Sequence, residues 1–200
     1  MQRLLEIMRQ LRAPEGCPWD REQTHESLRP YLLEEAAEAV DAIRLGEADA
    51  IAEELGDVLL QIAFHSVIAE EEKSFSYETV EASIVDKLIR RHPHVFSDTK
   101  LTSADEVVAN WQEIKKFEKQ PASLAESVPH SLPTLMRAAE LSKKLAWDEA
   151  NVQQDITEGL QEPNHQTIGQ ALLALASFAK ATGVNPDIAL RDAIQEKLKS

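Results

Sequence analysis

Two pairs of acidic residues in this chain have the spacing of a shared metal site. Glu35 and Glu38 lie three residues apart in one predicted helix, which puts both carboxylates on one side of it, about one turn apart. Glu54 and Asp57 repeat that spacing in the next predicted helix. If the two helices form an antiparallel hairpin that turns near Gly46, Glu38 lies level with Glu54. In the same register, Glu35 lies level with Asp57.

Four carboxylates gathered between two helices predict a bound divalent cation. They repel one another strongly unless cations neutralise them. An all-oxygen ligand set suits hard ions, so we expect Mg²⁺, with Mn²⁺ as a substitute. The alternative is a solvated acidic helix face. The apolar neighbours of the acids argue against it, because they indicate that the acidic stripe lies close to a buried face; these neighbours are Leu33, Val40, Leu55 and Val58.

The composition predicts an all-α protein. Of the 200 residues 43% are hydrophobic and only 5% aromatic, which favours helices over a sandwich or barrel. The net charge of −14 makes the chain a poor binder of nucleic acid polymers or anionic membranes. Cys17 is the only cysteine, so no intrachain disulfide forms, which fits a cytoplasmic location. We expect neither a signal peptide nor a membrane span.

The apolar periodicity and the cap signals predict the helices. Ser103 with Glu106 forms a capping-box signature, and Asn185 with Pro186 resembles an N-cap followed by proline. The segment 13–20 is predicted to be a loop from its prolines and glycine. We expect helices over residues 2–11, 24–44, 48–72, 77–91, 104–119, 133–145, 150–161, 167–182 and 186–199.

A proline-rich stretch divides the chain into two related halves. Residues 4–11 resemble 132–141, and residues 56–63 resemble 169–176, in the same order along the chain. Trp19-Asp20 likewise has a counterpart in Trp147-Asp148. We therefore predict a first domain over 1–120, a linker over 121–133 and a degenerate repeat over 134–200.

The second half keeps the hairpin pattern but loses half of its acids. Asp155 and Glu158 take the places of the first acidic pair. Thr167 and Gln170 take the places of the second pair, and the turn falls near Pro163. Two carboxylates hold a divalent ion poorly, so we interpret this half as a decayed copy that is kept for packing or assembly.

Basic and aromatic residues further along the chain could meet an anionic substrate. Lys87 and Arg91 lie four residues apart, so one helix face presents both to phosphate. Trp111 and Lys115 have the same spacing; the tryptophan could stack on a base while the lysine meets phosphate. The alternatives are ordinary surface charge for the basic residues and a core or interface position for Trp111.

The acidic motifs and their flanking segments resemble one enzyme family. Residues 34–38 read EEAAE and residues 54–57 read ELGD; the segments GCPWD (16–20), DKLIRRHPHVF (86–96) and NWQEIKKFEK (110–119) accompany them. Together they resemble the MazG-type nucleoside triphosphate pyrophosphohydrolases. The resemblance implies an all-α MazG-like helical bundle, usually dimeric, with a second degenerate MazG-like repeat. It also implies Mg²⁺-dependent cleavage of an NTP or dNTP to the monophosphate and pyrophosphate, in a nucleotide-pool housecleaning role.

These expectations define the predicted site. Glu35, Glu38, Glu54 and Asp57 are the predicted metal ligands and catalytic residues, and Lys87, Arg91, Trp111 and Lys115 are the predicted substrate-binding residues. The predicted partners are a nucleoside triphosphate and further copies of this chain, as a homodimer or higher homo-oligomer.

Two other functions stay open at this point. A ferritin-like metal protein needs Glu-x-x-His on two helices, and the chain offers only Glu22 with His25, away from the acidic pairs. A non-enzymatic helical interaction module is the other alternative, and the intact set of four acids argues against it.

Overall fold

The computed structural model describes residues 1–97, 99–118, 125–145 and 151–198, with the side chains of all of these except 115–118 and 125. Throughout this part of the chain the regular elements are helices, so the all-α prediction is confirmed. The chain divides into two compact units, Met1–Trp111 and Gln112–Ser200. The expected domain limits at residues 120 and 133 stay a prediction.

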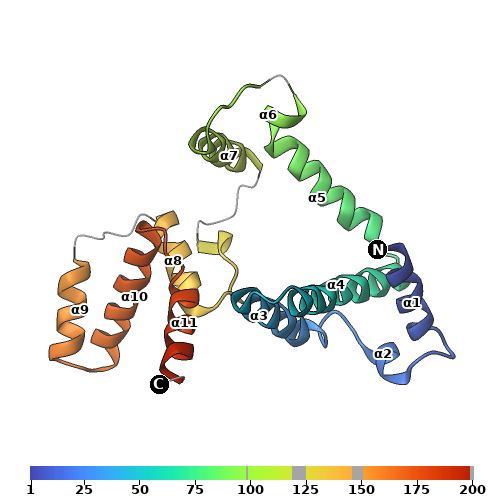
Figure 1. Ribbon diagram of the computed structural model, residues 1–200, viewed down its shortest axis with the longest axis horizontal. Coiled ribbons are helices and arrows are strands. Elements are labelled where there is room, and N and C mark those ends of the chain that lie inside the picture. Colours follow the sequence, from blue (N-terminus) through green and yellow to red (C-terminus); the bar gives the residue numbers. More distant parts are fainter. Residues whose placement is uncertain (98, 119–124, 146–150, 199–200) are drawn as a thin grey trace. The chain divides into compact units, whose positions relative to one another are not determined.

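The first unit is built around a helical hairpin (Figure 1). Its helices are α1 (Gln2–Arg12), α2 (Pro18–Glu22), α3 (Arg29–Leu45), α4 (Ala48–Glu71), α5 (Tyr77–Arg91) and α6 (Pro93–Phe96). Helix α7 (Ala104–Glu118) begins in this unit and continues into the second. Helix α4 packs on α3, on α1 and on α5, so it is the central element.

The α3/α4 hairpin turns where the sequence predicts. Gly46 ends α3 with a φ of 80°, in the left-handed region that glycine adopts at little cost, and its N–H donates to the Ala42 carbonyl at 3.0 Å. Only Gly46 and Glu47 separate the two helices. The buried α3 residues are the small Ala39 and Ala42, which let the helices approach closely.

A small apolar core joins α1 to the second half of α4. Leu5 and Met8 of α1 are at most 2% exposed and cluster with Phe64, Val67 and Ile68. Arg12 is also at this junction and forms a two-pronged ion pair with Glu71, at 2.7 and 3.0 Å. The remaining nitrogen of the guanidinium, Nη1, donates to the carbonyl of Gln23 at 3.1 Å. Arg12 thereby connects the segment before α3 to the end of α4.

The segment between α1 and α3 differs from the expectation. Helix α2 begins at Pro18, within the predicted loop 13–20, because proline suits the first position of a helix. Gly16 makes the preceding turn possible, since a Cβ there would lie 2.2 Å from the Leu11 carbonyl oxygen. Helix α3 begins at Arg29 instead of residue 24, because Thr24 and Ser27 exchange backbone–hydroxyl hydrogen bonds in a turn.

Several helix boundaries confirm the cap signals. Helix α5 ends at Arg91, directly before His92 and Pro93, and the unpredicted α6 follows. The Ser103 hydroxyl accepts the Glu106 N–H at 3.2 Å, while the Glu106 carboxylate accepts the N–H of Thr102, one residue earlier than a capping box requires.

The second unit repeats the order of the first. It contains a 3₁₀ turn η1 (Ala125–Ser127) and the helices α8 (Thr134–Leu145), α9 (Val152–Gln161), α10 (His165–Ala181) and α11 (Pro186–Leu198). Helix α10 packs on α8, α9 and α11, as α4 packs on α1, α3 and α5. This correspondence supports the repeat, although Trp147-Asp148 lies outside the described residues.

Two asparagines set the helix starts in this unit. The Asn164 side chain accepts the N–H groups of Gln166 and Thr167, so α10 begins at His165, two residues before the prediction. Asn185 accepts the N–H groups of Asp187 and Ile188, as its cap signal predicts.

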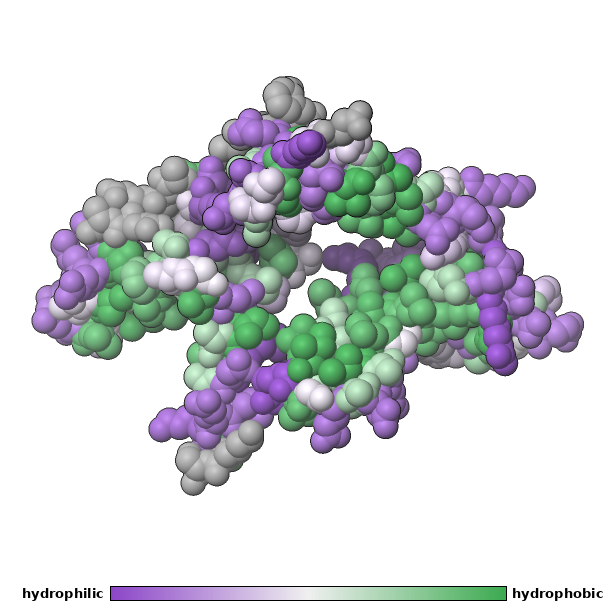
Figure 2. Space-filling view, turned by 45° about the horizontal axis from the view of Figure 1, so that its top comes forward, coloured by the Kyte–Doolittle hydropathy of each residue, from purple (hydrophilic) through white to green (hydrophobic). Residues whose placement is uncertain are grey.

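The surface carries many apolar side chains, which Figure 2 shows as green areas between charged ones. None of the helices in the described ranges combines the length and apolar character that a membrane span needs.

Candidate metal centre

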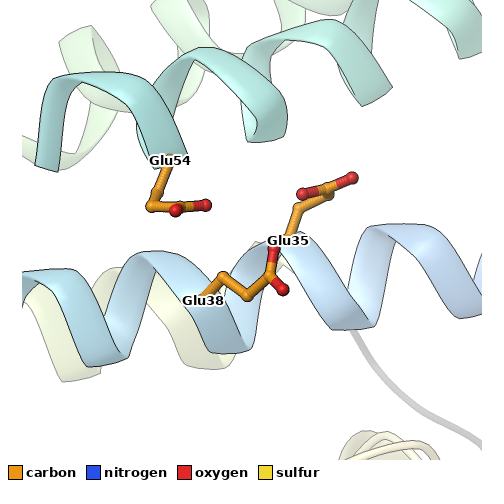
Figure 3. A group of neighbouring side chains, drawn as sticks. All are labelled: Glu35, Glu38 and Glu54. Atoms are coloured by element: carbon orange, nitrogen blue, oxygen red, sulfur yellow. The ribbon is translucent and has the colours of Figure 1, made fainter. Parts of the chain in front are cut away.

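Three of the four predicted ligands meet between α3 and α4. Glu35, Glu38 and Glu54 each offer one carboxylate oxygen, and these oxygens lie within 4.8 Å of one another. Figure 3 shows Glu35 and Glu38 on α3 and Glu54 on the facing part of α4, with their carboxylates between the two helices. Glu35 and Glu54 are partly buried, while Glu38 is exposed to solvent. The hairpin therefore gathers acids from both helices at one point.

The electrostatics of the site follow the predicted register. Burial and then the charge of Glu38 raise the pKa of Glu54 above its ordinary value. Burial and then the charge of Asp57 raise the pKa of Glu35. The strongest carboxylate neighbours are thus the cross-helix pairs that the hairpin predicts. Asp57 lies outside the group of three close oxygens but contributes its charge to the same site.

The donor set fits a hard divalent cation. All the close donors are carboxylate oxygens, the ligands that Mg²⁺ and Mn²⁺ prefer. Burial, and after it the charge of neighbouring carboxylates, raises the pKa of Glu35 and of Glu54, so both ionised forms are disfavoured and a bound cation would offset that cost. Within the described ranges, this is the one group of three or more His, Cys, Asp or Glu side chains with such close donor atoms.

One neighbour of the cluster was missed from the sequence. The Gln61 amide is only 4% exposed, and its Nε2 lies 3.5 Å from Glu35 Oε1. The signal was available: Gln61 interrupts an apolar run in α4 and lies one turn after Asp57. A polar residue on the buried side of a helix needs a partner, and here the partner is a predicted ligand.

Two of the predicted substrate-binding residues contact each other. Lys87 and Arg91 lie on α5, both partly buried, and the Arg91 guanidinium lies 5.8 Å from the centre of the Trp111 ring. The structure therefore joins Arg91 to Trp111 by a cation–π contact. The side chain of Lys115 lies outside the described residues. Placement of these residues beside the acids stays a prediction.

The apolar neighbours of the acids are not buried within one copy of the chain. Leu33 is 58% exposed, Leu55 50% and Val40 39%, and only Val58 is partly buried. The expectation of a buried face beside the acidic stripe is thus wrong for the isolated hairpin. The buried residues of α3 are the small Ala39 and Ala42, and the larger apolar side chains of this helix are exposed.

Trp19 of α2 contacts α3 one helical turn before the first acidic residue of the cluster. Its ring meets those of Tyr31 and Phe64 edge-on, at centroid distances of 6.0 and 6.3 Å. Tyr31 lies four residues before Glu35 on α3. The contacts anchor α2 on the hairpin, yet Trp19 is still 49% exposed.

The corresponding site in the second unit has no acid cluster of this kind among its described residues. The Thr167 hydroxyl donates to the Glu162 carbonyl at 2.7 Å and serves the cap of α10. Glu158 accepts a hydrogen bond from Gln154 on its own helix, and Gln170 is exposed. The turn lies between Gln161 and His165, as expected from Pro163.

The histidine of the ferritin-like alternative lies elsewhere. His25 stacks on His65, with the two Nδ1 atoms 2.7 Å apart, and its Nε2 lies 3.7 Å from Glu72. His25 contacts residues of the second half of α4 and its end, whereas Glu54 and Asp57 lie on the first half of that helix.

Comparisons with known proteins agree with this geometry. The family model for the MazG nucleotide pyrophosphohydrolase domain matches residues 23–96. The nucleoside triphosphate pyrophosphohydrolase of Escherichia coli is 39% identical over 214 residues, covering 96% of this chain and 81% of that protein. The nucleoside triphosphate pyrophosphohydrolase/pyrophosphatase MazG of Thermotoga maritima is 38% identical, covering 96% and 80%.

A solved mazG-related protein from Thermotoga maritima matches with a TM-score of 0.49 at 29% identity, covering 58% of this chain and 99% of that one. The extent of the sequence matches confirms the resemblance that the acidic motifs indicate. The chain belongs to the MazG nucleotide pyrophosphohydrolase family.

Proposed function

We propose that this protein hydrolyses nucleoside triphosphates, NTPs or dNTPs, to the monophosphate and pyrophosphate in a Mg²⁺-dependent reaction. The observation that carries the proposal is the group of carboxylate oxygens from Glu35, Glu38 and Glu54, within 4.8 Å of one another. The names of the Escherichia coli and Thermotoga relatives support the same reaction class.

The carboxylates of α3 and α4 would hold the metal. Glu35, Glu38 and Glu54 supply the close oxygens, and Asp57 adds a fourth negative charge beside Glu35. Bound Mg²⁺ would neutralise phosphate oxygens and acidify a water molecule. The fold would contribute by holding the acids close together before the metal binds, through the short turn at Gly46 and the small buried alanines of α3.

Other residues would bind the substrate. Lys87 and Arg91 offer positive charge to phosphate oxygens, and Trp111 and Lys115 offer a ring and a further cation. Trp19 is half exposed and contacts Tyr31, one turn before Glu35, so its ring would offer a further surface to a nucleobase.

The apolar surface of the hairpin supports self-association. Leu33, Ile43 and Leu55 are each at least half exposed on α3 and α4. Burial of such a surface against a second copy would remove apolar area from water. We therefore propose a homodimer or higher homo-oligomer. The cytoplasmic location and the housecleaning role belong to the same proposal.

Pyrophosphate release tests the function directly. Purified protein is incubated with the common NTPs and dNTPs and their deaminated forms, with Mg²⁺ or with EDTA. We expect release of pyrophosphate and a monophosphate in Mg²⁺ alone. If no nucleotide yields pyrophosphate with Mg²⁺ or Mn²⁺, the proposal is wrong and the cluster is a structural ion site.

A further inference from the structure

Gln61 of α4 is a buried amide with incomplete hydrogen bonding. Its side chain is 4% exposed, and its Oε1 has no hydrogen-bond partner among the described residues. Its Nε2 has Glu35 Oε1 as its partner, at 3.5 Å. A carboxylate only accepts hydrogen bonds, so the amide must present its N–H side to Glu35. A buried acceptor without a partner costs free energy of folding, so the presence of an amide here calls for an explanation other than stability.

Packing alone does not require an amide at this position. The following residues Ala63 and Phe64 are apolar and at most 3% exposed, so a side chain here faces the interior of the unit. The repeat offers a direct comparison, because residues 56–63 align with 169–176 and Gln61 aligns with Ala174. Ala174 is also buried, at 7% exposure. The equivalent hairpin therefore packs with an apolar residue at this site.

The amide accompanies the acids. The hairpin with four carboxylates has a buried glutamine on α4, whereas the hairpin with Thr167 and Gln170 in place of two acids has an alanine. A neutral N–H donor beside one ligand restrains that carboxylate without adding charge to a site that a cation must enter. A lysine or arginine there would instead compete with the metal for the acids.

We propose that Gln61 is a positioning residue of the metal centre, whose N–H group holds the Glu35 carboxylate toward Glu38 and Glu54. This inference rests on the proposed metal site. Gln61 is not itself a ligand in this scheme. Its effect is on how well the acids are arranged before the ion binds.

The test is Mn²⁺ binding by Gln61→Leu in the 200-residue protein without nucleotide, measured by calorimetry or by the loss of the free Mn²⁺ electron resonance signal. Leucine keeps a similar volume and removes the donor. We expect the Kd for Mn²⁺ to rise about 10- to 100-fold, the usual effect of losing a residue that orients a ligand. The melting temperature in EDTA should stay equal or rise, because an unsatisfied buried amide is removed. Unchanged Mn²⁺ affinity in a folded variant would overturn the inference.

Two further variants make the result specific. Gln61→Met is a second apolar replacement, used if the leucine variant does not fold, and the same Kd change is expected. Ser66→Ala is the matched control, since Ser66 is 1% exposed on the same helix and its hydroxyl donates to the Ile62 carbonyl within that helix. It should leave the Kd for Mn²⁺ unchanged. An equal loss of affinity in Ser66→Ala would mean that any change in the buried side of α4 disturbs the site, and the specific role of Gln61 would be rejected.

The wild-type measurement separates this inference from the proposed function. If wild-type protein does not bind Mn²⁺, the proposed metal site fails and the role of Gln61 fails with it. If wild-type protein binds and Gln61→Leu binds equally well, only the role of Gln61 fails. The half-saturating Mg²⁺ concentration for pyrophosphate release should rise in parallel with the Kd, and an unchanged value would also count against a positioning role.

Discussion

The α3/α4 and α9/α10 hairpins carry the same backbone plan with different chemistry. Each joins two antiparallel helices through a short turn; α4 also packs on α1 and α5, and α10 also packs on α8 and α11. In α3/α4 the facing positions hold acids, and an amide lies beneath them. In α9/α10 two of those positions hold Thr167 and Gln170, and Thr167 serves a helix cap. The hairpin is thus a general scaffold, and a few facing side chains decide whether it can hold a metal.

The helix contact also differs between the two hairpins. Gly159 of α9 aligns with Ala39 of α3, and both are buried. A Cβ on Gly159 would lie 2.8 Å from the Cβ of Ala171 and 3.1 Å from the Thr167 carbonyl oxygen. In the second hairpin the backbone of α9 at Gly159 lies directly against α10. In the first hairpin the space between α3 and α4 holds the methyl group of Ala39. A tighter hairpin suits packing, and a slightly wider one suits side chains that must surround an ion.

The largest expected effect is on turnover. Glu38→Gln should lower the rate of pyrophosphate release by about 10³-fold or more, because a lost ligand removes several kcal/mol of charge stabilisation. Asp57→Asn should act in the same direction. Circular dichroism should show unchanged helix content. Asp155→Asn is the matched variant in the other hairpin and should keep activity within about twofold. Full activity in Glu38→Gln would remove the basis for the metal site, and a large loss in Asp155→Asn would show that the second copy is not decayed.

The second effect is on the stability of the α9/α10 hairpin. Gly159→Ala should cost about 1–3 kcal/mol of unfolding free energy, because the new methyl group overlaps Ala171. Urea denaturation measures the loss, and hydrogen exchange should localise it to α9 and α10. The reverse change in the first hairpin, Ala39→Gly, should cost about 1 kcal/mol through helix propensity. Unchanged or increased stability in Gly159→Ala would contradict the close approach of α9 and α10 at this residue.

The third effect concerns the metal-free protein. The pKa of Glu54 is raised by burial and by the charges of Glu38 and Asp57, so the folded state disfavours its ionised form. The free energy of unfolding therefore falls as the pH rises from the ordinary pKa of 4.5 through the raised pKa of Glu54. Glu54→Gln should raise the melting temperature in EDTA at neutral pH by about 1–4 °C.

Mg²⁺ provides the contrast to that result. It should stabilise the wild-type protein but have little effect on Glu54→Gln, because only the intact site binds it well. Glu53→Gln is the comparison variant: Glu53 is exposed and raises the pKa of Glu54 less than Glu38 and Asp57 do, so its effect on the melting temperature should be smaller. A lower melting temperature for Glu54→Gln in EDTA would mean that Glu54 makes a stabilising contact, and would contradict net repulsion from Glu38 and Asp57.

The smallest effect is on the pH dependence of stability. His65 aligns with Phe178, and its pKa is lowered from 6.5 by burial and by the charge of His25. His65 therefore binds a proton more readily in the unfolded chain than in the folded protein. The free energy of unfolding accordingly falls as the pH falls through about 6.5 toward the lowered pKa. His65→Phe should flatten the fall in melting temperature between about pH 7.5 and about pH 5.5. Identical pH profiles for the two proteins would show that His65 does not couple to folding.

The site could be predicted from the sequence to the level of its backbone register. Two pairs of acids with a spacing of three, joined by a helix–glycine–helix pattern, specify which carboxylates face each other, and Glu35, Glu38 and Glu54 meet accordingly. The N-caps at Asn185 and Ser103 could be predicted in the same way. Each of these features depends on neighbours within a few residues, where helical geometry relates sequence spacing to spatial position.

The features that were missed depend on contacts between distant residues. Arg12 donates to the Gln23 carbonyl and pairs with Glu71, so the placement of the segment between α2 and α3 depends on the end of α4. Gln61 has the Glu35 contact only because α4 presents that side to α3. The exposure of Leu33 and Leu55 likewise depends on which faces the two helices turn toward each other.

The sequence by itself therefore determined the helices, the hairpin turn and the pairing of the acids, because periodicity and turn chemistry are local. Only the tertiary structure decided which side chains are buried beneath the acids and which apolar residues stay on the surface. The packing of one helix on another sets these, and spacing along the chain does not specify it.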